Sequence, residues 1–201
     1  METRVFALCA TMVIALPAQT FTTLLSFDGT NGATPKAGLI QATNGGLYGT
    51  TQGHGADDGG TIFKITPSGT LTTLYNFCSE SGCTDGRNPW TGLVQGTDGD
   101  FYGTTLYGGA YGNGTAFKIT PSGTLTTLYS FCAQSQRTGG ERPQAPLVQA
   151  TNGDFYGTTN KGGTADYGTV FSPSVGLGPF VETRRLPPAK WEKSSRSWRP
   201  I

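Results

Sequence analysis

The chain is 201 residues long, enough for one domain with a substantial core. Its 31 glycines, 12 prolines and 13% charged residues are typical of a turn-rich β protein and argue against a helical one. The net charge of +1 hides an asymmetry, because 8 basic residues stand against 12 acidic ones before Arg184. The body is therefore mildly acidic and lacks a basic stripe for phosphate backbones, which argues against a nucleic-acid partner.

Residues 1–18 are predicted to be a signal peptide. A short charged opening with Glu2 and Arg4 precedes an apolar run from Val5 to Leu16, and cleavage is expected near Ala18. The run is too short for a stable membrane span. These features predict a secreted, extracellular protein. The alternative is that the segment forms a buried first strand.

One motif organises the rest of the chain. Gly-Asp-Phe-Tyr-Gly-Thr-Thr at residues 99–105 has counterparts at 45–51 and 153–159, which places Tyr48, Tyr102 and Tyr156 at intervals of 54 residues. A fixed period of this length indicates stacked copies of one supersecondary unit. The predicted units are repeat 1 (residues 19–69), repeat 2 (70–123) and repeat 3 (124–176), followed by a tail (177–201).

Each unit is predicted to contain four short strands. In the middle of the chain the first lies around 92–95, and a tight Asp-Gly turn leads to the second at 101–105. The third lies at 115–119, and a Thr-Pro-Ser-Gly turn precedes the fourth, exemplified by residues 71–77. Residues 21–25 repeat the pattern of the fourth strand, and the last unit stops after its third strand, at 169–171.

The fold class predicted from this pattern is all-β: a β-propeller-like array of three four-stranded repeats of ~54 residues. Apolar side chains on both faces, such as Ile62 and Phe63, fit blades that are packed face to face. A β-solenoid is the alternative. Three blades fall below the usual number of about four to eight, so we expect a fragment of a larger ring or copies that self-associate to complete one. In a ring, residues 21–25 could complete the final blade.

Three linked motifs carry a family resemblance: Phe-Tyr-Gly-Thr-Thr, Gly-Thr-x-Phe-Lys-Ile-Thr-Pro-Ser-Gly and Leu-Thr-Thr-Leu-Tyr-x-Phe, spread from Phe21 to about Ser174. Together they resemble the Gloeobacter/Verrucomicrobia-type (GloVer) tandem repeat of bacterial surface proteins. The resemblance implies a secreted or surface-anchored, propeller-like protein, and it brings no established activity or catalytic residue. The tail departs from the family pattern, with neither an immunoglobulin-like domain nor a sorting signal.

The connections differ in length and variability. The tight turns are nearly identical between units, whereas the long loops at 52–60, 106–114, 160–168, 28–37, 78–91 and 132–145 vary. Because these long loops should all emerge on one side, they predict a varied binding face. The ligand-binding candidates there, suited to stacking on sugar rings or to a protein partner, are Trp90, Tyr107, Tyr111, Tyr167, Arg87 and His54. The alternative is that these side chains only cover glycine-rich loops.

No constellation in the sequence calls for catalysis, a metal or a cofactor. His54 is the only histidine, and Asp57-Asp58 lacks the spacing of an EF-hand. Asp100 follows a tight turn and Gly46 replaces it in the first unit, so we interpret Asp100 as a turn residue and not as a catalytic one. Lys118 on a third strand is expected to pack by its stem with a solvated head.

Cys78 and Cys83 flank a short loop and are predicted to form a disulfide in an exported protein. Cys132 is the repeat counterpart of Cys78, but Arg137 stands where Cys83 would be. The thiol of Cys132 therefore has three possible fates: the reduced form, an intermolecular bridge or disulfide scrambling. Cys9 lies within the predicted signal peptide.

The tail at 177–201 is basic and carries two of the three tryptophans. We expect it to be disordered, as an out-of-frame end or as an arm for an acidic partner or a membrane surface. The favoured function is a secreted or cell-surface, non-enzymatic module that binds polysaccharide or a surface protein. The alternatives are a propeller-type carbohydrate-active hydrolase or lyase, and a purely architectural spacer.

Overall fold

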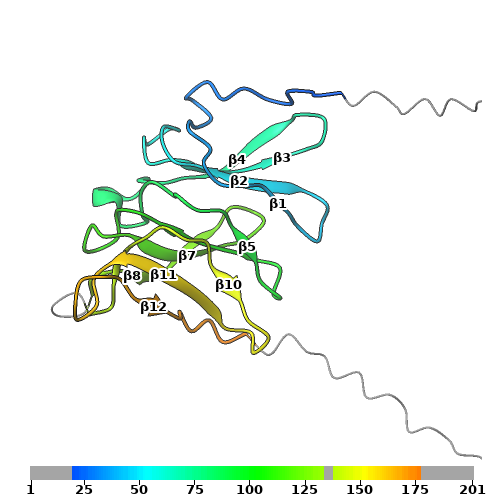
Figure 1. Cartoon of the computed structure of the whole chain (residues 1–201). Helices are drawn as coiled ribbons and strands as arrows, with labels where there is room; N and C mark the ends of the chain where they lie inside the picture. The colour runs from blue at the N-terminus through cyan, green and yellow to red at the C-terminus, as the bar shows by residue number, and fades with distance from the viewer. Residues whose placement is uncertain (1–19, 134–137, 178–201) are drawn as a thin grey trace, which may run out of the picture.

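The computed structural model describes residues 20–133 and 138–177 (Figure 1). The predicted signal peptide and all but the first residue of the predicted tail lie outside them. Among the described residues the only helix is one turn of 3₁₀ helix, η1 (Ser81–Cys83), and no helix is long and apolar enough to cross a membrane. The expected all-β, propeller-like array of three four-stranded antiparallel sheets is confirmed.

The first two sheets repeat the same meander. The first has the order β1 (Ile40–Gln41), β2 (Leu47–Thr51), β3 (Thr61–Ile65) and β4 (Leu71–Asn76). The second has the order β5 (Val94–Gln95), β6 (Phe101–Thr105), β7 (Thr115–Ile119) and β8 (Leu125–Ser130). Each sheet therefore ends with a strand that the predicted boundaries assign to the next repeat, so sheets and sequence units are offset by one strand.

The third sheet is assembled differently. It has the order β10 (Val148–Gln149), β11 (Phe155–Lys161) and β12 (Val170–Phe171), and its fourth strand is β9 (Glu141–Pro143), which pairs with β11 rather than β12. The same pairing exists in the other units as single bridges, Ala33 with Gly53 and Arg87 with Tyr107. Within residues 20–133 and 138–177, β12 is thus paired along one edge only.

Residues 21–25 were expected to form a strand and, in a ring, to complete the final blade. The described segment contains no strand there, and it lies against the first sheet, where the Phe27 ring packs on Phe63 at 5.2 Å. The physical reason is that each fourth strand pairs with the third strand that precedes it, and the described residues, which begin at residue 20, contain no such strand before residue 21. The segment therefore lies at the opposite end of the array from the third sheet (Figure 1).

The Tyr-Gly-Thr-Thr motif encodes how the second and third strands fit together. Gly103 lies opposite Phe117, and a Cβ at residue 103 would come within 2.6 Å of the Phe117 ring, so only glycine leaves room for it. Two residues later the hydroxyl oxygens of Thr105 and Thr115 are 2.8 Å apart, and the Thr115 amide donates to the same Thr105 oxygen. The Phe ring and the threonine pair recur in all three units, which explains why these letters repeat.

The sheets stack through a chain of aromatic contacts. Tyr48 of the first sheet lies 4.2 Å from Phe101 of the second, and Tyr102 of the second lies 4.1 Å from Phe155 of the third. Tyr48 and Tyr102 are fully buried. Tyr156 is not, because no further sheet follows the third among the described residues.

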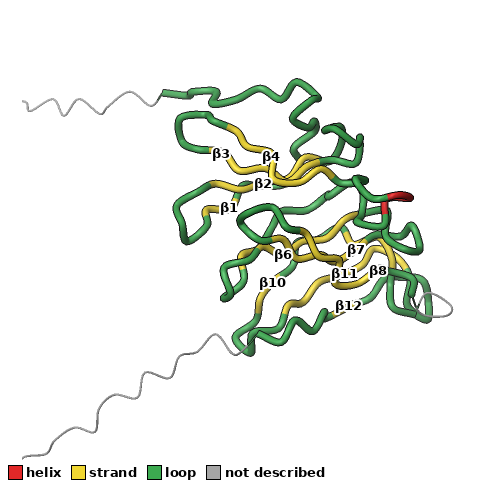
Figure 2. Tube along the Cα trace, turned by 180° about the vertical axis from the view of Figure 1, so that it is seen from behind, coloured by secondary structure: helices red, strands yellow, loops and turns green. Residues whose placement is uncertain are grey.

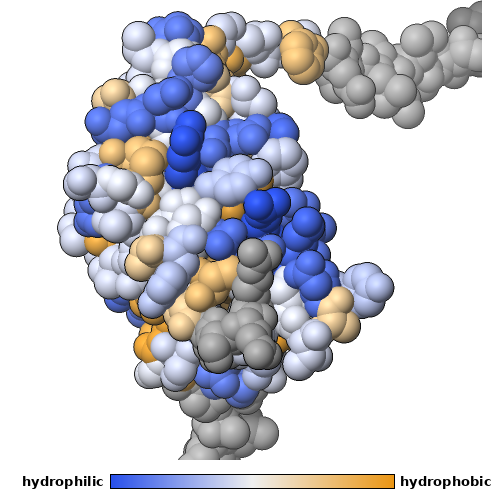
Figure 3. All heavy atoms as spheres, turned by 90° about the vertical axis from the view of Figure 1, so that its left-hand side faces the viewer, coloured by the Kyte–Doolittle hydropathy of each residue, from blue (hydrophilic) through white to orange (hydrophobic). Residues whose placement is uncertain are grey.

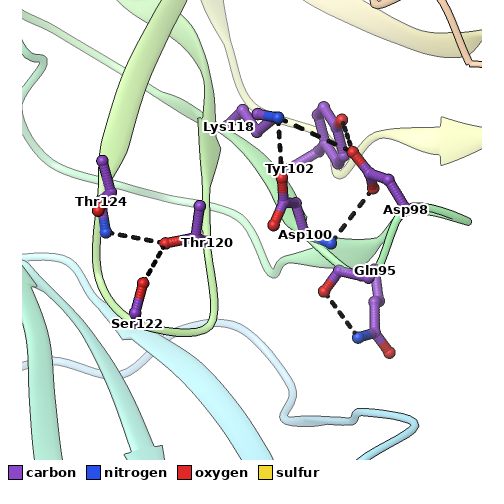
Figure 4. Close-up of polar contacts among 9 residues, drawn as sticks. Gln95, Asp98, Asp100, Tyr102, Lys118, Thr120, Ser122 and Thr124 are labelled. Carbon is purple, nitrogen blue, oxygen red and sulfur yellow. Dashed lines mark hydrogen bonds and ion pairs between the residues drawn. The ribbon is translucent and has the colours of Figure 1, made fainter.

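The tight turns and the long loops lie at opposite ends of the strands (Figures 1 and 2). On the turn side, Lys118 Nζ lies 2.8 Å from Asp100 Oδ2, and Tyr102 donates its hydroxyl to Asp98 (Figure 4). The solvated head expected for Lys118 is in addition ion-paired, because the second unit supplies a carboxylate where the first has Gly46. This hydrogen bond to Asp100 raises the pKa of Lys118 above its usual value.

Candidate ligand-binding groove

A groove of about 680 Å³ runs along the edge of the array where the first strands of the three units begin. Lys36, Trp90 and Gln144 line it, one from each repeat and all at the same repeat position. Apolar surface from Leu39 and Pro146 completes the lining. We call this cavity the axial groove, because the first strands of a propeller's blades face its axis.

Trp90 is held in the axial groove by its neighbours in the chain. Pro89 is buried, and Asn88 fixes the segment by donating its side-chain Nδ2 to Gln52 O at 2.8 Å and its backbone N to Gly59 O at 2.7 Å. On the other side of the tryptophan, Thr91 O accepts the hydroxyl of Thr50 from the first sheet. The indole is thus mounted on a segment of the second unit that is tied on both sides of Trp90 to the first unit.

The groove combines one cation, one indole and one amide. Lys36 Nζ lies 3.4 Å from the centroid of the Trp90 ring, a cation–π contact that places positive charge directly beside flat apolar surface. Gln144 is exposed and offers both a donor and an acceptor. A sugar ring that carries a carboxylate matches this set, since an indole stacks on the ring and an ammonium pairs with the carboxylate.

Arg87 lines a different cavity, of about 480 Å³, on the loop side. Its other walls are Asp57, Asp58, Glu80 and the disulfide loop closed by Cys78 and Cys83. This second cavity gathers the carboxylates of Asp57, Asp58 and Glu80, and His54 does not line it.

The remaining predicted residues stand apart from Trp90 along the loop side. Tyr107 is partly covered by Arg142, whose guanidinium carbon lies 5.5 Å from its ring centroid, whereas Tyr111, Tyr167 and His54 are exposed on separate loops. Figure 3 looks onto this side, where hydrophobic and hydrophilic residues are interleaved rather than gathered into one patch. The structure therefore does not bring the six predicted residues together into one site.

Comparison with known proteins decides the family. A profile of the Gloeobacter/Verrucomicrobia repeat matches residues 10–180. The chain belongs to this repeat family. A comparison with curated proteins found no match.

Among solved structures, this repeat protein is similar to the X-ray structure of a candidate gluconolactonase, at 16% identity and a TM-score of 0.39. The match covers 68% of this chain and 47% of the other, so the chain spans about half of that protein's length. A likeness this slight carries no argument about function.

Within this family fold, two groove residues were missed by sequence reasoning. Lys36 and Gln144 replace Trp90 in the other repeats, and neither was among the predicted ligand-binding residues. The signal that could have found them is the period itself, because equivalent positions of adjacent repeats line up along one edge of a stacked array.

The cysteines of the repeat protein differ between units. Cys78 and Cys83 are joined in a disulfide, a local clip whose short loop stabilises by about 2 kcal/mol in the chain-entropy model. In the third unit the Cys132 thiol donates to Glu141 Oε2 at 3.3 Å. No group of three or more acidic, histidine or cysteine side chains converges as metal ligands in the described part of the chain.

Proposed function

We propose that this protein is a secreted or cell-surface, non-enzymatic repeat module that binds acidic polysaccharide in the axial groove. One observation carries the proposal: three successive repeats contribute Lys36, Trp90 and Gln144 to a single open groove. A groove built from successive repeats suits an extended, periodic ligand better than a small isolated one, because each repeat can meet another part of the chain.

The chemistry of the lining supports an acidic sugar. Trp90 supplies a flat apolar surface for a pyranose ring, and Lys36 supplies the charge that discriminates a uronate from a neutral sugar. The ammonium must leave the indole or slide along it when a ring stacks there, so the carboxylate of the ligand would replace the cation–π contact with an ion pair. Neutral polysaccharides lack that compensation and should bind more weakly.

The test is affinity for polyuronate oligosaccharides and matched neutral oligosaccharides, measured by calorimetry. Trp90→Ala is expected to abolish measurable binding of both, and Lys36→Gln to remove the preference for the acidic ligand while weakening it by about tenfold. Tyr167→Ala is the control, because that ring is 92% exposed on a loop that does not line the groove. Wild-type protein that binds none of these ligands would contradict the proposal.

The same samples test the hydrolase or lyase alternative. Incubation with the polysaccharides should release neither reducing ends nor unsaturated products. Turnover that disappears in an Asp57→Ala/Asp58→Ala variant and persists in Trp90→Ala would place an active site in the second cavity instead. Export is tested separately, by whether residues 1–18 direct a reporter domain out of bacterial cells.

A further inference from the structure

The third sheet ends the array with an apolar face whose equivalents are buried or half-buried in the other two sheets. Val170 is 77% exposed, although Ile62 and Ala116 at the same repeat position are fully buried. Val148 and Tyr156 are exposed on the same face. We call Val148, Tyr156 and Val170 the leading face.

The first sheet forms the opposite end of the array, and its apolar side chains are also less buried than their equivalents in the second sheet. Leu39 is 51% exposed and Leu47 is half-buried, whereas their equivalents in the second sheet, Leu93 and Phe101, are buried. We call Leu39 and Leu47 the trailing face. Residues 21–27 lie beside this face, where Phe27 packs on Phe63, yet Leu39 and Leu47 keep exposed surface.

The array itself shows how two such faces meet. At both internal contacts the recurring tyrosine of one sheet lies within 4.2 Å of the phenylalanine that opens the second strand of the next. At the ends of the array the corresponding pair is Tyr156 and Leu47, on the leading and the trailing face. A leading face of one copy and a trailing face of another therefore offer the same apolar partners that already pack twice inside each chain.

An unfilled strand position accompanies the leading face. A cavity of about 330 Å³ lies beside β12, lined by Leu128, Tyr129, Val170 and Phe171, and β12 has no strand on its outer edge among the described residues. In the first two sheets that position is taken by β4 and β8, which share the Leu-Thr-Thr-Leu-Tyr sequence.

The chain carries one spare copy of this strand. Residues 21–25 read Phe-Thr-Thr-Leu-Leu, form no strand, and expose Phe21 and Leu24. The segment lies against the first sheet as the end of the first sheet's fourth strand lies against the second sheet. Phe27 packs on Phe63 as Phe77 packs on Phe117. Its Leu24 carbonyl also lies over Gly69 as the Leu74 carbonyl lies over Gly123.

We infer that two copies of this chain dock head to tail, the leading face of each on the trailing face of the other. Residues 21–26 of each copy then form the strand beside β12 and complete the third sheet of the partner copy. In this register Leu25 lies opposite Val170, as Tyr75 lies opposite Ile62 in the first sheet. A contact of this heterologous kind must close into a ring or grow into a filament. Two copies supply six sheets, the one multiple of three within the usual range of about four to eight blades.

The inference is tested by light scattering of the purified full chain at tens of micromolar. We expect twice the protomer mass. Val170→Asp and Leu47→Asp, one on each face, should each weaken pairing by at least about a hundred-fold and give monomers, because an aspartate there would be buried without a partner. Tyr167→Asp is the matched control for an added charge and should remain a dimer.

Circular dichroism and thermal unfolding of the separated variants show whether each protomer keeps its sheets. Mixing Val170→Asp with Leu47→Asp provides a second readout, since this pair retains one intact contact and should form an open dimer. A monomeric wild type, an open series of larger species, or a Val170→Asp variant that remains a dimer would overturn the inference. The two variants leave the groove lining unchanged, because neither Val170 nor Leu47 lines the groove, although Leu39 belongs to both the groove and the trailing face.

Discussion

The second and third sheets share one motif and differ in their surroundings. Tyr102 and Ala116 of the second sheet are 1% and 0% exposed, while Tyr156 and Val170, at the same positions of the third, are 39% and 77% exposed. The strands pair in the same register in both sheets, Gly103 with Phe117 and Gly157 with Phe171. The motif therefore determines how the strands pair and in which direction each side chain points, whereas burial of a side chain depends on whether another sheet packs on that face.

The largest expected difference concerns the recurring tyrosine. Tyr102→Ala should lower the free energy of unfolding by about 3–5 kcal/mol, because it removes a buried ring that stacks on Phe155. Tyr156→Ala should cost less than about 1 kcal/mol when both are measured by urea unfolding in the monomeric Val170→Asp background. Equal losses at the two positions would show that the third sheet is covered within its own chain.

A second, smaller difference concerns the glycine beneath the phenylalanine ring. Gly103→Ala should destabilise by about 1–3 kcal/mol, because its methyl group would press on Phe117, which is held on both sides. Gly157→Ala should cost less, since Phe171 is only half-buried and can move toward the open side. Gly38→Ala is the control, because no atom lies near the new methyl group. A comparable loss of unfolding free energy in that variant would contradict the steric explanation.

The smallest difference concerns the ion pair on the turn side. Lys118 pairs with Asp100 in the second sheet, whereas Ser172 stands at that position in the third. Lys118→Met should cost less than about 1 kcal/mol near neutral pH, and less still in high salt. Because the pKa of Lys118 is raised in the folded state, this contribution is complete below the ordinary value of 10.5 and is lost as pH rises through the folded-state pKa.

The measurement for that pair is the difference in unfolding free energy between wild type and Lys118→Met at several pH values. Lys64→Met is the matched control, since Gly46 replaces the carboxylate in the first unit. A difference that persists unchanged in strongly alkaline solution would mean that Lys118 acts through its aliphatic stem alone.

Much of the fold could be predicted from the sequence because the period is strict. Tight-turn dipeptides and the recurring Tyr-Gly-Thr-Thr located the strands, and three linked motifs identified the family, as the profile match confirmed. The role of residues 21–25 could not be predicted, because a strand-like pattern does not show whether a neighbouring strand is in place to pair with it. The β9 pairing was missed for a related reason: in two of three units it is a single bridge without a sequence signature.

The candidate site was harder to predict than the fold. The aromatic residues of the loops were grouped by chemistry, but a group of this kind says nothing about which side chains share a cavity. Trp90 lines the axial groove, while Tyr111 and Tyr167 lie on separate loops. Alignment of equivalent repeat positions, which brings Lys36 and Gln144 beside Trp90, is the physical rule that chemistry alone does not contain.

The most direct test of the account is amide hydrogen exchange in β7 and β12 at two protein concentrations. We expect the amides of Ala116 and Phe117 to exchange slowly at both concentrations. We expect the amides of Val170 and Phe171 to become protected only at the concentration where two copies pair, and never in the Leu47→Asp variant. Rapid exchange in β12 at every concentration, or slow exchange that does not depend on concentration, would contradict the claim that a second copy covers this end of the array.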